Sequence, residues 1–260
     1  MTKIRLAVES RGRADRVATI SVDNPAKLNI LDPAGIAALV RSLNELAADD
    51  ALRAVILRGA GSRAFIGGAD IRAMAALDRE SARLFISALH GVCEAIRGLP
   101  VPVIARIEGY ALGAGLEIAA SCDLRVAADT AKVGMPEVKV GIPSVIEAAL
   151  LPQLIGWGRA RRLLLTGEII DAGTAERWGL VERVVAPADL DAAVEEWVTA
   201  ILAAGARAIR LQKALVRDWE ELSLSEAIER GINAFAEAYQ TSEPAERMAA
   251  FLQKGKSRRT

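Results

Sequence analysis

Short apolar strands that run into turns and then into helices constrain this chain more than any other sequence feature. The strand Val17–Val22 ends at an Asp-Asn-Pro turn, Ala54–Leu57 ends at Gly59, and Val101–Ile107 runs into Gly109. Apolar side chains with helical spacing follow each of them, so strand, turn and helix recur at intervals of roughly 40–50 residues. This alternation is typical of an α/β fold with mostly parallel strands.

The second half of the chain has a different pattern. After about Pro143 the strand signals fade, and apolar residues recur with the spacing of helices. We therefore expect an α/β core over residues 1–190 and a helical region over residues 191–260. Helices that cannot bury all their apolar faces alone predict an assembly surface. The alternative is that these helices simply cover the core.

Composition excludes several classes of protein. The 33 Lys+Arg balance the 33 Asp+Glu, and a formal net charge of zero argues against nucleic-acid binding. Two cysteines, Cys93 and Cys122, and the single His90 argue against a disulfide scaffold and a metal centre. Pro, Gly or charge interrupts every apolar stretch before it could span a membrane. The N-terminus lacks the apolar segment of a secretory signal, so we expect a cytoplasmic protein.

Two glycine-rich turns, residues 59–71 and 109–117, each lead from a strand into a helix. Glycine lets backbone amides approach a ligand closely, and the first N–H groups of a helix favour negative charge. Two such turns side by side predict an oxyanion hole built from two amides. The second turn matches neither the dinucleotide-binding glycine pattern nor a P-loop. Tight packing of strand against helix is the alternative explanation.

Two glutamates stand in apolar surroundings. Glu117 falls in the first turn of an apolar helix, and Glu137 follows the short strand Lys132–Val133 within the sequence Gly-Met-Pro-Glu-Val. Dipole compensation and ordinary solvation are the simpler explanations for either residue alone. Two carboxylates facing one pocket can divide the roles of acid and base, or hold one water between them. Beside an oxyanion hole, this arrangement suits proton transfer next to a thioester carbonyl. We expect a structural role for His90.

In this order, the segments resemble the enoyl-CoA hydratase/isomerase (crotonase) superfamily over nearly the whole chain. The resemblance rests on residues 25–29, 64–71, 107–117, 134–137 and 166–181. It implies a spiral of ββα repeats with a C-terminal helical region that forms a homotrimer or homohexamer.

The resemblance also implies roles for individual residues. The backbone N–H groups of Ala69 and Ala114 would form the oxyanion hole, and Glu117 and Glu137 would be catalytic. The residues along the CoA substrate would be Lys27, Leu28, Gly68, Ala69, Asp70, Ile71 and Gly113. Having both glutamates favours addition of water across the 2,3 double bond of a 2-enoyl-CoA. No metal and no cofactor beyond the CoA of the substrate is implied.

Two departures from the family pattern bear on the site. Gly67 replaces an alanine, which should loosen the first turn without removing an amide. Bulkier residues and an extra acid in the segment Ser144–Leu150 alter what lines the acyl end of the site. Two other functions stay open. One is double-bond isomerisation with Glu137 shuttling a proton, or another acyl-CoA reaction of the crotonase type. The other is a non-catalytic acyl-CoA-binding protein.

Overall fold

The computed structural model describes residues 1–12 and 14–257, with side chains through residue 253. The chain divides into two compact units, Met1–Trp197 and Val198–Thr260. The boundary lies inside helix α8, Leu190–Ala203, a few residues beyond the expected one. As predicted, an α/β part precedes a helical part.

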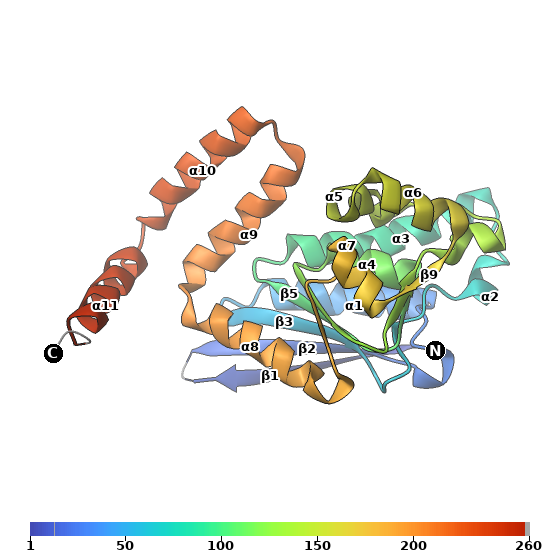
Figure 1. Ribbon diagram of the computed structural model, residues 1–260, viewed down its shortest axis with the longest axis horizontal. Helices are drawn as coiled ribbons and strands as arrows, with labels where there is room; N and C mark the ends of the chain where they lie inside the picture. Colours follow the sequence, from blue (N-terminus) through green and yellow to red (C-terminus); the bar gives the residue numbers. More distant parts are fainter. Residues whose placement is uncertain (13, 258–260) are drawn as a thin grey trace. The chain divides into compact units, whose positions relative to one another are not determined.

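A six-stranded sheet forms the base of the first unit (Figure 1). Its strands, in spatial order, are β1 Lys3–Arg11, β2 Asp15–Asp23, β3 Leu52–Gly59, β5 Val103–Ile107, β7 Leu124–Ala128 and β10 Arg183–Val185. Only the β1–β2 pair is antiparallel, and the other neighbours run parallel, as the alternation predicts. Strand β3 is almost entirely buried and β5 entirely so, which explains why apolar residues predominate in both.

A second sheet explains the repeat. Its strands are β4 Ala64–Ile66, β6 Tyr110–Leu112, β8 Lys132–Gly134 and β9 Ile169–Asp171. Each of β3, β5 and β7 lies in the large sheet, and the next strand along the chain lies in the small one. Helices follow, so two strands and a helix form each repeat, as the resemblance implies.

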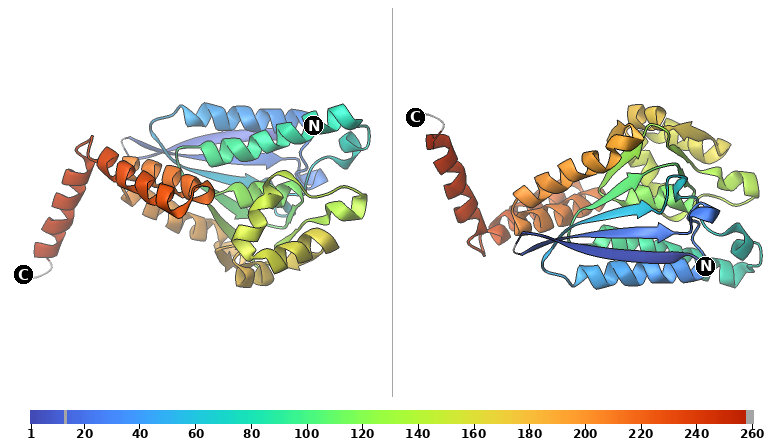
Figure 2. Two further views of the ribbon diagram at one scale, coloured as in Figure 1. Left: turned by 90° about the horizontal axis from the view of Figure 1, so that it is seen from above. Right: turned by 90° about the horizontal axis from the view of Figure 1, so that it is seen from below.

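Helices cover the sheets of the first unit. They are α1 Pro33–Ala47, α2 Ile71–Met74, α3 Arg79–Gly98, α4 Ala114–Ser121, α5 Leu151–Ile155, α6 Trp157–Thr166 and α7 Ala172–Trp178, with 3-10 turns η1 Pro25–Lys27, η2 Pro136–Val140, η3 Ile146–Leu150 and η4 Pro187–Asp189. The Asp32 side chain caps α1 by accepting from the Gly35 amide, and Pro33 follows it, as predicted. Helix α3 packs against α1 and against α4 (Figure 2). The buried face of α3 therefore adjoins the helix that carries Glu117.

The second unit contains α9 Ala206–Glu221, α10 Leu224–Ala238 and α11 Glu243–Ser257. Ser223 and Glu226 form a reciprocal capping box at the start of α10. Helices α9 and α10 pack together, yet α10 keeps a stripe of large apolar side chains exposed, namely Leu224, Ile228, Ile232 and Phe235. Among the described residues, no helix is both long and apolar enough to cross a membrane.

Candidate active site

Three neighbouring parallel strands of the small sheet assemble the site. Strand β6 lies between β4 and β8 and runs parallel to both. Because parallel strands end at the same edge of a sheet, the segments that leave them come together there. The segment after β4 contains Ala69, the one after β6 contains Ala114 and Glu117, and the one after β8 contains Glu137. Ala69 and Glu137, which are 68 positions apart in the sequence, therefore lie near the same edge of the small sheet.

Gly67 lets the first glycine-rich turn, residues 59–71, pack closely against Leu28 instead of loosening it. Its amide donates to the Leu28 carbonyl oxygen at 2.8 Å. A Cβ at Gly67 would lie 2.8 Å from that oxygen and 2.9 Å from the Leu28 Cβ, closer than real Cβ atoms approach their neighbours. The expectation that glycine loosens this turn is therefore wrong. The missing side chain lets the turn pack directly against Leu28, whose own φ is 56°.

The amides of Ala69 and Ala114 are available to a ligand. Leu31 binds the residues on either side of Ala69: it donates to the Gly68 carbonyl and accepts from the Asp70 amide, both at 2.9 Å. The Ala69 N–H therefore points away from that pairing. Ala114 is the first residue of α4, where an N–H has no partner within the helix. Neither amide has a hydrogen-bond acceptor within the described part of the chain.

Glu117 is a buried carboxyl group. It lies on α4 with 4% of its surface exposed, and the Ala148 amide donates to its Oε1 at 3.3 Å. Close packing holds this helix in place, because a Cβ on Gly115 would lie 2.0 Å from the Ile66 carbonyl oxygen. Burial, followed by the nearby negative charge of Glu137, raises the pKa of Glu117 to about 8. Glu117 is therefore protonated at neutral pH in the free protein.

Glu137 is held from two sides. Ser144 donates its hydroxyl to Oε2 at 3.0 Å. Oε1 lies against Gly113, where a Cβ would be 2.1 Å away. Partial burial raises the pKa of Glu137 above its usual value, and the Ser144 hydrogen bond opposes that rise. The negative charge of Glu137 is one cause of the raised pKa of Glu117, so the protonation of one acid depends on the charge of the other.

Both acids and both amides line one cavity of about 780 Å³. Helix α3 forms an apolar wall with Ala82, Phe85, Ile86 and Leu89, spaced to lie on one helical face. Arg83 and Lys139 are the cationic side chains that line it. The cavity can therefore take a largely apolar ligand that also carries negative charge.

Most of the residues predicted from sequence line this cavity, namely Gly68, Ala69, Ile71, Gly113, Ala114, Glu117 and Glu137. Lys27, Leu28 and Asp70 are not among the lining residues. Lys27 is exposed at the end of η1, and the Leu28 carbonyl holds Gly67. The Asp70 side chain caps α2 by accepting from the Arg72 amide at 2.9 Å. Leu28 and Asp70 thus make backbone contacts around the first glycine-rich turn.

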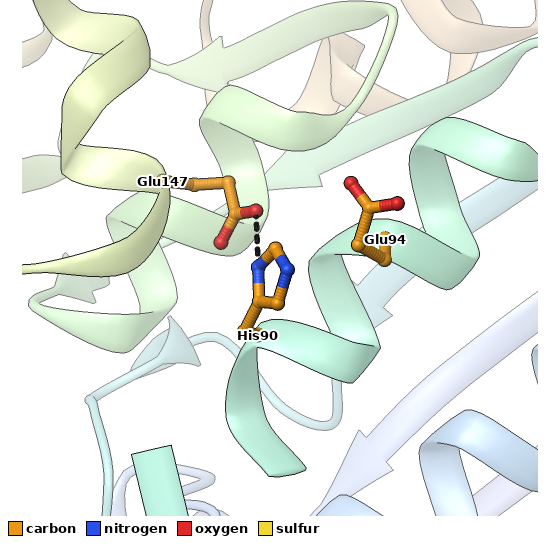
Figure 3. A group of neighbouring side chains, drawn as sticks. All are labelled: His90, Glu94 and Glu147. Carbon is orange, nitrogen blue, oxygen red and sulfur yellow. Dashed lines mark hydrogen bonds and ion pairs between the residues drawn. The ribbon is translucent and has the colours of Figure 1, made fainter. Parts of the chain in front are cut away.

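Sequence reasoning missed the groups that hold the glutamates. The hydroxyl of Ser144 and the amide of Ala148 belong to the segment that was noted only as unusual. The same segment carries Glu147, which binds His90 of α3 (Figure 3). A short-range pattern of polar and apolar residues carries no signal for such contacts, because Ala148 and Glu117 are 31 residues apart.

One group of possible metal ligands occurs within the described residues, His90, Glu94 and Glu147, whose ligand atoms lie within 4.8 Å of one another (Figure 3). His90 and Glu94 project from α3, and Glu147 faces them from η3. The Nδ1 atom of His90 is already bound to Glu147, which uses one of the available ligand atoms.

The chain is similar to known proteins in sequence and in fold. Residues 12–259 match the family model described as enoyl-CoA hydratase/isomerase. A crotonyl-CoA hydratase of Syntrophomonas wolfei is 35% identical over 94% of this chain and 95% of its own length. A probable enoyl-CoA hydratase of Mycobacterium bovis is 39% identical over 93% of each chain. The crystal structure of an enoyl-CoA hydratase of Mycobacterium smegmatis superimposes with a TM-score of 0.91, at 34% identity over 96% of both chains.

Proposed function

The chain belongs to the enoyl-CoA hydratase/isomerase family, and we propose that Glu117 and Glu137 carry out its reaction, the addition of water to an enoyl-CoA thioester. Relatives named as hydratases over almost the whole length of this chain support that hydro-lyase activity. The single observation that carries the residue assignment is that two carboxyl groups and two unpaired amides line the same cavity.

The amides of Ala69 and Ala114 act as the oxyanion hole. A thioester carbonyl oxygen that accepts from both amides gains negative charge when a nucleophile adds to C3 of the double bond. Fixed donors stabilise that charge without reorganising, which makes such sites effective. Removing one donor of this kind typically costs about 10²–10³ in rate.

The two glutamates handle water and protons as one unit. The ionised carboxylate takes a proton from the water while the water oxygen bonds to C3. The electron pair of the 2,3 double bond moves to the thioester as an enolate, and C2 then takes a proton from the neutral carboxyl. One proton enters the pair and one leaves it, so the pair holds the same number of protons after the turnover. A proton then passes from the former base to the former acid before the next turnover. Two acids with raised pKa values suit proton transfer in either direction.

The substrate is an acyl-CoA thioester. Lys27, Leu28, Gly68, Asp70, Ile71 and Gly113 are proposed to lie along the CoA portion, with Ala69 at its carbonyl. The apolar wall of α3 is proposed to receive the acyl chain. CoA arrives as part of the substrate, and the reaction as written needs no further cofactor.

Assembly and location are further parts of the proposal. The exposed apolar stripe of α10 supports a homotrimer or a homohexamer formed through the C-terminal helical region. A cytoplasmic location, with neither a nucleic-acid nor a membrane partner, agrees with the zero net charge.

Product analysis tests the reaction directly. The protein is incubated with crotonyl-CoA and, separately, with a 3-enoyl-CoA, and the products are separated by chromatography. Hydration predicts 3-hydroxybutyryl-CoA from the first substrate, with oxygen-18 incorporated from labelled water. If the protein isomerises the 3-enoyl-CoA but adds no water to crotonyl-CoA, it is an isomerase instead. Tight binding of both esters without turnover would indicate a binding protein.

A further inference from the structure

A buried third carboxylate lies behind the catalytic pair. Glu147 of η3 is 6% exposed, and its Oε1 is 2.8 Å from Nδ1 of His90 (Figure 3). Its Oε2 is buried and accepts no hydrogen bond from any described residue. An incompletely satisfied buried acid lowers stability, so its presence at a reactive site indicates a function there.

The backbone links Glu147 to Glu117. Ala148 directly follows Glu147, and its amide is the donor that reaches Oε1 of Glu117. The turn η3 packs against both α3 and α4. His90 on α3 therefore holds Glu147. Because Ala148 is the next residue, that contact also positions the Ala148 amide, which donates to Glu117 on α4.

The backbone of this turn is strained. Ile146 has a φ of 37°, a conformation that β-branched residues rarely adopt. Such strain persists only where surrounding contacts fix it. The hydrogen bond between Glu147 and His90 fixes the adjacent residue.

The charge of Glu147 also reaches the site. It contributes to the raised pKa of Glu117, after burial and Glu137. The other ionisable neighbours are Cys93 of α3, a buried thiol whose pKa is raised by burial and then by Glu147, and Glu94, which pairs with Arg97 at 3.9 Å.

We propose that Glu147, oriented by His90, is a positioning residue for Glu117: it fixes the turn that places the Ala148 amide and sets a negative charge behind the catalytic carboxyl. This inference rests on the proposed function of Glu117. The unusual segment Ser144–Leu150 then holds both acids. Ser144 donates to Glu137, and the Ala148 amide, positioned by Glu147, donates to Glu117.

The test compares pH profiles of kcat for Glu147→Gln with those of the native chain. Glutamine keeps the size and can still accept from His90, but it removes the charge. Since a like charge disfavours ionisation, its loss lowers the pKa of Glu117, and the alkaline limb should move to lower pH. KM and Tm should stay close to native. Glu94→Gln is the matched control in the same cluster, and its profile should not move.

A second variant keeps the test decisive if Glu147→Gln folds poorly. His90→Ala removes the orienting group from a half-exposed position and should lower kcat about two- to tenfold, the range of one hydrogen bond, with KM unchanged. All assays are repeated with EDTA. The inference is overturned if Glu147→Gln keeps the native alkaline limb and His90→Ala keeps the native kcat. It is also overturned if EDTA lowers the activity, because that would indicate a bound cation at His90, Glu94 and Glu147.

The native chain and Glu117→Gln are assayed in the same series. If the native chain does not hydrate, or if Glu117→Gln is fully active, the proposed function itself fails. If both behave as proposed and only the Glu147 and His90 variants are native-like, the positioning role alone is refuted.

Discussion

The carboxylate of Glu137 occupies the space into which a side chain at Gly113 would project. A Cβ there would lie 2.1 Å from Oε1 of Glu137, and the φ of Gly113 is 53°. The glycine that precedes α4 thus has two functions: it turns the chain so that the Ala114 amide is free, and it leaves room for the Glu137 carboxylate from the next repeat.

Gly113→Ala should therefore damage catalysis more than folding. The added methyl group must displace Glu137, and general acid–base catalysis is typically worth 10²–10⁴-fold. We expect kcat for crotonyl-CoA hydration to fall within that range. Gly158→Ala on α6 is the control, because a Cβ there meets nothing within 4 Å. Equal activity of the two variants would show that Glu137 does not need its present position.

The oxyanion hole is tested by deleting one amide proton. Proline is accepted at the first position of a helix, and Ala114 is that position in α4, so Ala114→Pro should fold. It should lose about 10²–10³ in rate because one donor is gone. Ala114→Gly retains the donor and should stay active. A folded Ala114→Pro variant, verified by circular dichroism, with native kcat would exclude this amide from the oxyanion hole.

The pH dependence follows from the raised pKa values of the two acids. Glu117 has a pKa of about 8, so it loses its proton, and activity falls, as the pH rises through that value. Glu137 has a pKa above the ordinary value, so on the acid side activity falls as this carboxylate is protonated. Initial rates between pH 5 and pH 10 should give a bell-shaped profile of kcat/KM. A rate that stays constant through pH 9 would contradict a protonated Glu117.

Assembly should depend on the apolar stripe of α10. Light scattering at micromolar concentration should give three or six times the chain mass of 27.6 kDa. Ile232→Asp places a charge in the stripe, at a residue 58% exposed in the single chain, and should yield smaller species. Glu229→Gln on the same helix is the control. A native chain with the mass of one subunit would refute the oligomer.

The glycine-rich turns and the acids were predictable because their signals are local. Glycines with positive φ, such as Gly113, and an acid in an apolar helix, such as Glu117, can be recognised within a few residues. Strands β4 and β6 of the small sheet have three residues each, too few to establish a period, so their pairing was hidden. The edge strand β1 is mostly exposed, although Ile4, Leu6 and Val8 alternate as in a strand, and this pattern was overlooked.

Contacts between distant segments were not predictable in the same way. Glu147 and His90 are 57 residues apart, and each alone suggests an ordinary helix or turn residue. Gly67 was misjudged for the same reason. What decides its effect is Leu28, whose carbonyl oxygen would lie 2.8 Å from a Cβ at Gly67 and which only the folded chain brings close.

The most direct test of the central claim measures hydration by Glu117→Gln and Glu137→Gln. Each substitution keeps the shape of the side chain and removes its ability to exchange a proton. Steady-state rates with crotonyl-CoA, together with dissociation constants for a saturated acyl-CoA, separate chemistry from binding. The account predicts that each variant loses about 10²–10⁴ in kcat while its affinity for the saturated ester stays native. A near-native kcat in either variant would contradict the assignment of the two glutamates as the catalytic pair.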